Sequence, residues 1–190
     1  MIDELFQGIR AKARELDRPI KLQEIVLAET QTTELITQCD LAIYATPIYV
    51  DNMTSLLQEF MERTAEVFTK YHPPIVFLSN CGFPGQHHFD VPRRFFRLFA
   101  QNRQTQLIAE VCRDEGSLLS SHSAVPPAVA TRIQAYRSQL RQAGEELIQH
   151  AALTPQTALC LREPLMPPEA YIAFHNARFV AYSRPQKLDG

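Results

Sequence analysis

Apolar residues recur along this chain at two spacings, which predict an alternation of helices and strands. Near the start, a stripe with the period of a helix predicts an amphipathic helix that ends at Asp17-Arg18-Pro19. The stripe consists of Ile2, Leu5, Phe6, Ile9, Ala13 and Leu16. Short apolar runs of the kind found in buried strands follow at residues 20–28, 41–45, 75–78 and 107–111.

Capping residues mark where several helices between and after these runs are expected to begin. The expected caps are Thr32 or Thr33 for a short helix through Gln38, Ser55 with Gln58 as a capping box, Asp90 for a basic helix over 91–102, and Thr154 before Pro155. A longer stripe from Val129 to Ile148 predicts another helix. The segment from Pro167 is expected to pack back on the domain as a final helix.

This order of elements predicts an α/β fold with a parallel sheet that is covered by helices on both faces. At 190 residues the chain is long enough for one core, and no linker or repeat interrupts it. We therefore expect a single domain over residues 1–190. Within it, residues 150–183 form a C-terminal helical extension, and residues 184–190 form a solvated tail.

Composition and charge narrow the classes of function. The formal net charge of -2, with 45% hydrophobic and 21% charged residues, provides no general attraction to nucleic acid or to anionic membranes. No apolar run approaches the roughly 18 residues of a membrane span, and the charged, amphipathic start differs from a signal peptide. We expect a cytoplasmic protein without nucleic-acid or membrane partners.

Metal sites are not expected from the cysteines and histidines. The chain has four cysteines that are far apart and form no C-x-x-C pair: Cys39, Cys81, Cys112 and Cys160. Free, buried thiols in a reducing compartment are the expected state. His87 and His88 invite a metal interpretation, but adjacent histidines rarely reach one ion, so we expect them in a solvated loop lip. His122 and His175 have no evident partners.

The loop after the apolar run at 41–45 is the first candidate for chemistry. It reads Thr46-Pro47-Ile48-Tyr49-Val50-Asp51-Asn52-Met53, and an apolar-striped helix follows it. Ligands of parallel α/β sheets bind beyond the carboxyl ends of the strands. Tyr49 can lie against an aromatic ring, and the amide of Asn52 can donate and accept hydrogen bonds at an imide edge. The alternative is an ordinary turn with a buried tyrosine.

The loop after the next apolar run is the second candidate and reads Asn80-Cys81-Gly82-Phe83-Pro84-Gly85. Loops that leave adjacent parallel strands face the same crevice, so both loops can contact one ligand. Glycine allows close approach of the backbone, and Cys81 is either a redox-active or an inert thiol. The alternative for this loop is a plain turn.

The two loops and the C-terminal part of the chain resemble the flavodoxin-like NADPH-dependent FMN reductases. The matching motifs are Thr46-Pro47-Ile48-Tyr49 with Asn52-Met53, Ser79-Asn80-Cys81-Gly82-Phe83-Pro84, and Ala143-Gly144-Glu145-Glu146-Leu147. The last motif and the segment from Thr154 to Leu165 resemble the helical extension of the iron–sulfur-flavoprotein-like branch. The resemblance implies a flavodoxin-like three-layer sandwich with a parallel sheet.

For the site, the resemblance implies FMN as the cofactor and NAD(P)H as a co-substrate. The residues that it implies around the isoalloxazine ring are Thr46, Pro47, Ile48, Tyr49, Asn52 and Met53, with Asn80, Cys81, Gly82 and Phe83 at the other edge. The flavin supplies the redox chemistry, so no catalytic acid or base and no metal is expected. The implied partners are a small-molecule electron acceptor or redox partner and a second copy of the chain in a homodimer.

One part of the family pattern is missing. Members begin with a strand and a G-S-P-R-type loop that binds the FMN phosphate, whereas this sequence begins with the helix at Ile2. The strands at 20–28 and 41–45 are then expected to pair or to leave a gap. Three explanations stay open: a start upstream of Met1, a degenerate relative that binds flavin weakly or serves as a non-catalytic scaffold or interaction protein, or a partner chain that fills the gap.

The helix over 91–102 carries a basic face, which consists of Arg93, Arg94, Arg97 and, just beyond the helix, Arg103. This face can attract the phosphate of NADPH. A solvated face is the simpler interpretation and is what we expect.

Overall fold

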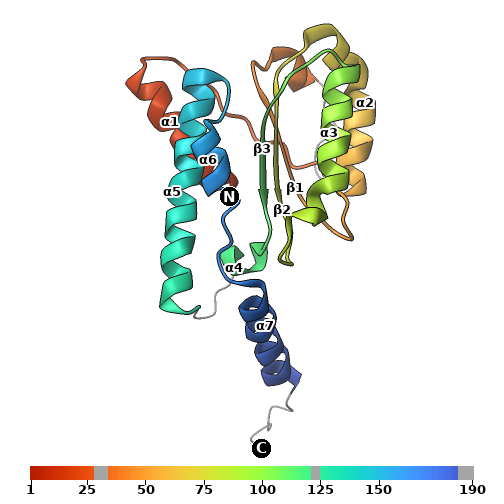
Figure 1. Cartoon of the computed structure of the whole chain (residues 1–190). Coiled ribbons are helices and arrows are strands. Elements are labelled where there is room, and N and C mark those ends of the chain that lie inside the picture. The colour runs from red at the N-terminus through yellow and green to blue at the C-terminus, as the bar shows by residue number, and fades with distance from the viewer. Residues whose placement is uncertain (28–33, 121–124, 184–190) are drawn as a thin grey trace, which may run out of the picture.

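The computed structural model describes residues 1–27, 34–120 and 125–183, which form three layers (Figure 1). A parallel sheet lies in the middle and contains β1 (Ala42–Pro47), β2 (Ile75–Asn80) and β3 (Leu107–Arg113), in this order. One face is covered by α1 (Ile2–Glu15) and α5 (Pro127–His150), the other by α2 (Ser55–Tyr71) and α3 (Asp90–Asn102). The remaining elements are η1 (Glu34–Gln38), η2 (Gln86–Phe89), α4 (Gly116–Ser120), α6 (Pro155–Cys160) and α7 (Pro168–Ser183).

Each face of the sheet has its own apolar core, because the central strand β2 is buried on both sides. Val76 and Leu78 belong to the core under α1 and α5, whereas Ile75 and Phe77 belong to the core under α2 and α3. Such a continuous apolar strand is typical of a parallel sheet that is covered on both faces. The predicted α/β fold, a flavodoxin-like three-layer sandwich, is confirmed.

The predicted strand over residues 20–28 is wrong for the part that the structure describes. Residues 18–27 contain no strand, and their expected pairing with β1 is not found among the described residues. Leu22 packs against the α1–α5 core, whereas Leu27 packs against the α2–α3 core. The segment therefore crosses from one face of the sheet to the other instead of running along β1, and it leaves Val26 49% exposed.

Two helices begin without the predicted caps. Thr54 precedes the first residue of α2, Ser55, and no side chain caps this helix. The amide of Gln58 donates to Oδ1 of Asn52 at 3.4 Å instead of completing a capping box. The helix α3 begins at Asp90 itself and likewise has no side-chain cap. Both predicted caps are therefore wrong, although the helices lie where the apolar stripes place them.

The cap at the start of α6 is confirmed. The hydroxyl of Thr154 accepts the backbone N–H of Thr157 at 3.2 Å, and proline occupies the first helical position. The cap that was predicted at Thr32 or Thr33 lies outside the described residues.

The carboxylate of Glu146 on α5 reinforces the Thr154 cap. It accepts the Thr154 N–H at 2.8 Å, the Thr154 hydroxyl at 3.0 Å and the Thr157 hydroxyl at 2.6 Å. Burial raises the pKa of this carboxyl, but the hydrogen bonds from Thr157 and Thr154 outweigh burial, so the pKa lies below its usual range. The carboxylate therefore ties α6 to the end of α5.

Glu146→Gln is expected to destabilise the chain at neutral pH and to matter less in acid. Because its folded-state pKa is lowered, the carboxylate contributes stability above its unfolded-state pKa of about 4.3 and loses it as the pH falls through the folded-state value. We expect a loss of about 1–3 kcal/mol at pH 7 in urea unfolding, and a smaller loss at about pH 3. The neighbouring Glu145→Gln is the control and should cost less than about 0.5 kcal/mol at pH 7. Equal losses by Glu146→Gln at both pH values would contradict this role.

The helices α1 and α5 pack backbone against backbone. A Cβ atom on Gly8 would lie 1.8 Å from the carbonyl oxygen of Arg141, and one on Gly144 would lie 2.2 Å from the carbonyl oxygen of Leu5. Nε of Arg141 also donates to the carboxylate of Glu4 at 2.6 Å, across 137 residues of sequence. The two glycines therefore set how closely the helices approach.

Within residues 1–27, 34–120 and 125–183, no helix combines the length and the hydropathy that crossing a bilayer demands.

Candidate functional site

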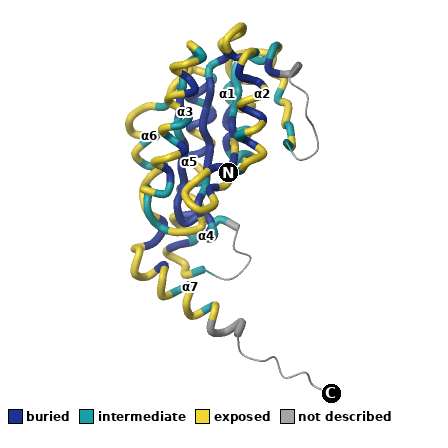
Figure 2. Tube along the Cα trace, turned by 90° about the vertical axis from the view of Figure 1, so that its right-hand side faces the viewer, coloured by how far each residue is buried: buried dark blue, intermediate teal, exposed yellow. Residues whose placement is uncertain are grey.

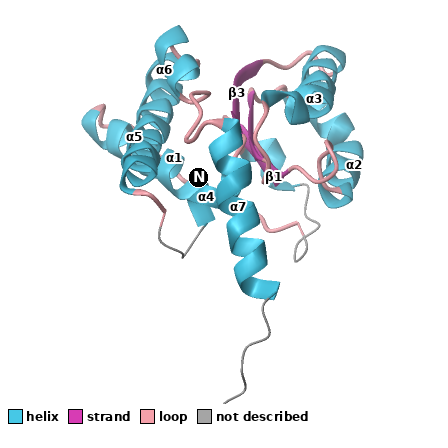
Figure 3. Cartoon of the chain, turned by 60° about the horizontal axis from the view of Figure 1, so that its bottom comes forward, coloured by secondary structure: helices cyan, strands magenta, loops and turns pink. Residues whose placement is uncertain are grey.

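The loops that follow the three strands meet at one end of the sheet, which we call the carboxyl edge. The Ile48 N–H donates to the Asn80 carbonyl at 2.8 Å, and the Cys81 N–H donates to the Arg113 carbonyl at 2.9 Å. These bonds continue the strand pairing into the loops. The helix α4 and the start of α7 lie at the same end, as the view in Figure 3 shows. In parallel α/β sheets this is the end that binds ligands.

A tight turn shapes the first loop. Tyr49 and Asn52 exchange backbone hydrogen bonds of 2.9 and 3.1 Å across it, and Val50 and Asp51 have φ angles of 51° and 59°. Two consecutive left-handed residues are typical of a type I′ turn. A β-branched residue rarely adopts this conformation, so the turn at Val50 is strained. The turn holds Tyr49 at the surface with 67% of its area exposed.

The predicted site residues of the first loop form two groups, one buried in the protein and one exposed to solvent. The buried group, at most 5% exposed, contains Thr46, Ile48 and Met53. The exposed group contains Pro47, Tyr49 and Asn52. Oδ1 of Asn52 accepts the Met53 N–H at 2.9 Å, so this oxygen already serves the loop itself. A ligand at the carboxyl edge would therefore meet the exposed group.

The second loop presents Gly82 and Phe83 to solvent, with Phe83 70% exposed. Cys81 is only 6% exposed and belongs to the α2–α3 core. The amide of Asn80 packs against Gly116, where a Cβ atom would lie 2.8 Å from Asn80 Nδ2. Of the four predicted residues in this loop, Gly82 and Phe83 are thus the ones that face outward.

A contact between Asp51 and His88 joins the first loop to η2, which follows the second loop. Nδ1 of His88 lies 2.5 Å from Oδ1 of Asp51, and the His88 side chain is 18% exposed. The ring of His88 also lies 4.0 Å from the ring of His87 and 6.4 Å from that of Phe83, measured between centroids. The solvated loop lip that the sequence predicts is therefore wrong for His88, which links the Val50–Asp51 turn to the surface around Phe83.

The buried side chain of Arg113 supports the second loop through Asp114. Arg113, which is 0% exposed, donates to the Asp114 carboxylate at 2.5 Å and to the Glu163 carbonyl at 2.8 Å. The other oxygen of Asp114 accepts the Gly85 N–H at 2.8 Å, and the guanidinium lies 5.1 Å from the ring centroid of Tyr136. One side chain thus connects β3, the second loop and the segment after α6.

Glu115, which is 1% exposed, extends this network to the start of the C-terminal extension. Its carboxylate accepts the N–H of Leu165 at 2.7 Å and that of Met166 at 3.2 Å, and it lies 3.7 Å from the Arg113 guanidinium. Burial raises the pKa of Glu115, although the Leu165 N–H and the charge of Arg113 oppose this shift. The extension therefore docks through buried polar groups at the carboxyl edge.

Three further polar side chains meet at this edge and were not predicted. The hydroxyl of Ser117 on α4 lies 2.5 Å from the hydroxyl of Tyr171 and 3.2 Å from Nε2 of His175. The Tyr171 hydroxyl donates to the Gly82 carbonyl. The expectation that His175 has no partner is therefore wrong. The contacts join residues 54 or more positions apart, and no local pattern indicates them.

The final helix packs on the domain through its first turns. Tyr171 is 4% exposed and Phe174 is partly buried against the α1–α5 core. Ile172 and Phe179, by contrast, are 54% and 72% exposed, and the helix projects from the body of the molecule (Figure 2). The prediction that this segment packs back on the domain is confirmed for its beginning only.

The cysteines are free thiols, as predicted, but they differ in burial. Cys81 and Cys112 are buried, whereas Cys39 and Cys160 are partly exposed. Burial raises the pKa of Cys112 to about 12, so its thiolate form is negligible at neutral pH. Within the described residues, no three His, Cys, Asp or Glu side chains are placed to share a metal ion.

Known proteins resemble this chain only distantly. No protein-family model and no curated protein matches it. A solved structure of a thermophilic tryptophan halogenase from Streptomycin violaceusniger has a TM-score of 0.46 and 14% identity, over 73% of this chain and 89% of that chain. An NADPH-quinone reductase from P. pentosaceus has a TM-score of 0.40 and 15% identity, over 71% and 87%. These values are too low to transfer a function.

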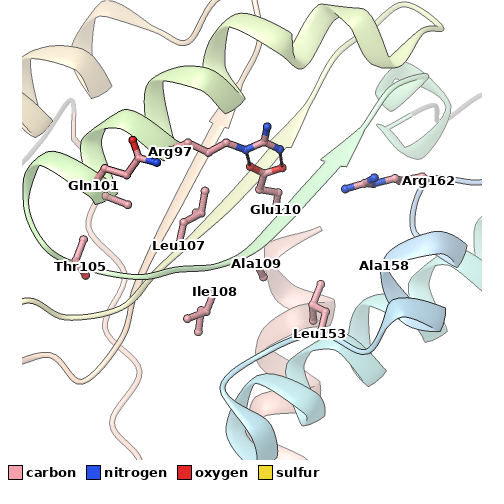
Figure 4. Close-up of a pocket in the computed structure, with 11 residues that line it drawn as sticks. Arg97, Gln101, Thr105, Leu107, Ile108, Ala109, Glu110, Leu153, Ala158 and Arg162 are labelled. Atoms are coloured by element: carbon pink, nitrogen blue, oxygen red, sulfur yellow. Dashed lines mark hydrogen bonds and ion pairs between the residues drawn. The ribbon is translucent and has the colours of Figure 1, made fainter.

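Two arginines on the basic face of α3 are paired with side chains of the protein. Arg97 donates to both carboxylate oxygens of Glu110 on β3, at 2.7 and 2.8 Å, while 59% of its side chain stays exposed (Figure 4). The side chain of Arg93, which is 12% exposed, donates to Oε1 of Gln86 at 2.6 Å and lies 5.4 Å from the ring centroid of Phe89. The predicted solvated face is therefore confirmed for Arg97 and wrong for Arg93.

A groove of about 440 Å³ lies beside the Arg97–Glu110 pair, along the outer edge of β3 (Figure 4). Its apolar lining includes Leu107 and Ile108 of β3 and Leu153, while Arg162 points into it from the segment after α6. The groove runs beside β3, whereas the predicted site residues lie at or just beyond the carboxyl ends of β1 and β2. Its lining comes from segments about 50 positions apart in sequence, which is why no motif indicates it.

Proposed function

We propose that the carboxyl-edge loops bind the isoalloxazine ring of FMN and that the protein is a cytoplasmic NAD(P)H-dependent flavin oxidoreductase. The observation that carries this proposal is the pair of exposed aromatic rings, Tyr49 and Phe83, on loops that leave adjacent strands of a parallel sheet. Exposed aromatic rings at a strand end suit a flat aromatic ligand. The hydrogen bond between Asp51 and His88 supports it further, because it ties the first loop to η2, directly after the second loop.

The described residues fit the ring of the cofactor better than its phosphate. Pro47, Tyr49, Asn52, Gly82 and Phe83 offer an aromatic and amide surface. The backbone N–H that a glycine loop would turn to a phosphate is already used, because Gly85 donates to the carboxylate of Asp114. Ring contacts are therefore expected to carry most of the affinity.

When bound, the flavin would accept hydride from NAD(P)H and pass electrons to a small-molecule acceptor or redox partner. The role of the protein is to orient the ring. Tyr49 and Phe83 would contact the ring, and the Val50–Asp51 turn fixes Tyr49 in place. A second copy of the chain, in a homodimer, is part of this proposal. The alternative is a non-catalytic scaffold, in which the same loops would form an interaction surface.

Titration of FMN with the full chain is expected to quench flavin fluorescence and to saturate in the low micromolar range. Tyr49→Ala should weaken binding about tenfold, because loss of one aromatic contact corresponds to about 1.4 kcal/mol. Tyr71→Ala is the matched control, since Tyr71 is also exposed but ends α2, before β2 begins at the opposite end of the sheet. Turnover of NAD(P)H with the bound flavin completes the test.

Riboflavin separates ring binding from phosphate binding. Because ring contacts dominate, riboflavin should bind within about threefold of FMN, which corresponds to less than about 0.7 kcal/mol. A titration of wild-type chain that never saturates would rule out the flavin proposal and favour the scaffold. Much tighter binding of FMN than of riboflavin would contradict a site that recognises the ring alone.

A further inference from the structure

The tip of the second loop is held by polar contacts rather than by packing of its own side chains. A Cβ atom on Gly82 would meet nothing within 4 Å, and Phe83 is 70% exposed. The Gly82 carbonyl accepts the Tyr171 hydroxyl, the Phe83 carbonyl accepts the Glu115 N–H at 3.2 Å, and the Gly85 N–H donates to Asp114. Hydrogen bonds with Tyr171, Glu115 and Asp114 thus fix the loop tip.

The number of hydrogens gives the Tyr171 contact a direction. The Gly82 carbonyl can only accept, so it takes the single hydroxyl proton of Tyr171. The Ser117 hydroxyl lies 2.5 Å from the Tyr171 oxygen and 3.4 Å from the Gly82 carbonyl, so its single proton can go to either oxygen. Nε2 of His175 lies 3.2 Å from the Ser117 oxygen. The hydroxyls of Tyr171 and Ser117 thus converge on the Gly82 carbonyl, with His175 behind Ser117.

The surroundings keep the Tyr171 hydroxyl protonated. Burial raises the pKa of Tyr171, although its bond with Ser117 opposes the shift, so the hydroxyl keeps its proton at neutral pH. Burial and the nearby charge of Arg178 lower the pKa of His175, which favours the neutral ring. A neutral ring donates to Ser117 when its proton is on Nε2 and accepts from Ser117 when its proton is on Nδ1.

We propose that Tyr171 and Ser117 are positioning residues, which hold the Gly82–Phe83 loop in the shape that the ring-binding surface needs. Tyr171 lies on α7 and Ser117 lies on α4. The C-terminal helix α7 thus helps to set the shape of a site that the loops after β1 and β2 form. The identity of the ligand rests on the proposed function. The restraint on the loop does not, because it is a property of the chain without ligand.

Hydrogen exchange of the full chain without ligand tests the restraint. Tyr171→Phe keeps the buried ring and removes the hydroxyl, so the N–H of Gly85, bonded to Asp114, and that of Glu115, bonded to the Phe83 carbonyl, should exchange at least about fivefold faster while the urea midpoint stays that of wild type. Tyr136→Phe is the matched control, because the Tyr136 hydroxyl is buried and has no hydrogen-bond partner among the described residues. His175→Gln, which keeps a donor, should exchange more slowly at this loop than His175→Ala.

Flavin binding gives the second measurement. Tyr171→Phe and Ser117→Ala should weaken FMN binding by about threefold to tenfold, with Tyr136→Phe unchanged. Unchanged exchange of the Gly85 and Glu115 N–H groups in Tyr171→Phe, or faster exchange spread over the whole chain, would overturn the positioning role. Failure of wild-type chain to bind FMN would instead count against the proposed function, and the exchange result would still decide the present inference.

Discussion

Arg113→Met is expected to lower the free energy of unfolding by about 3–5 kcal/mol. The guanidinium is fully buried and serves the Asp114 carboxylate, lies close to Glu115, and donates to the Glu163 carbonyl. Methionine fills much of the same volume but leaves the two acidic groups without their cation. The cost of a buried charge without a partner is what makes the effect large.

Urea unfolding of the variants measures this effect. Arg132→Met is the control, since Arg132 also donates to a backbone carbonyl, at 3.2 Å, but on the surface. It should cost less than about 1 kcal/mol. The double variant Arg113→Met with Asp114→Asn should lose less stability than the sum of the two single losses. The reason is that the Asp114 carboxylate, which Arg113→Met leaves without a cation, is then absent. A loss below about 1 kcal/mol for Arg113→Met would contradict the network.

Gly144→Ala is expected to destabilise the chain by about 1–3 kcal/mol. In an ordinary helix interior the same change stabilises by roughly 1 kcal/mol, so the expected sign is reversed. The reason is the carbonyl oxygen of Leu5, which would lie 2.2 Å from the new Cβ atom. A backbone atom cannot rotate away as a side chain can, so α1 and α5 must separate.

Thermal unfolding of Gly144→Ala and Gly8→Ala tests the backbone contact. Gly82→Ala is the control, because a Cβ atom there would meet nothing within 4 Å. It should change stability by less than about 0.5 kcal/mol. The double variant at positions 8 and 144 should cost less than the sum of the single changes, since the helices need to move apart only once. A stabilised Gly144→Ala would show that the helices are not in backbone contact.

The spacing of apolar residues was enough to place most elements but not to say what pairs with what. The stripe that begins at Ile2 and the run that begins at Ile75 each gave the correct element. The run at 20–28 has equally strong strand composition. Its Leu22 and Leu27 are partly buried on opposite faces of the sheet, which local composition does not reveal. Whether a strand forms depends on the fold placing the segment alongside an edge, and this segment crosses between the faces instead.

The candidate loops were likewise located by sequence, while the directions of their side chains were not. Tyr49 points outward because Val50 and Asp51 adopt left-handed angles. Neither is glycine or asparagine, the residues that usually indicate such a turn, so the type of turn was not predictable. The contact between Tyr171 and Gly82 spans 89 positions and depends on the docking of α7. Such a contact can be identified only once the fold is known.

The contact between α1 and α5 also sets an order of events during synthesis. Glu4 and Arg141 are 137 residues apart, so a ribosome that adds about 5–20 residues per second needs roughly 7–27 seconds between them. During that time Leu5 and Ile9 have no native neighbour on α5, and a helix of 14 residues is marginal on its own in water. The helix α1 is therefore synthesised well before it can dock, and until α5 is complete the nascent chain exposes the apolar stripe of α1 to chaperones.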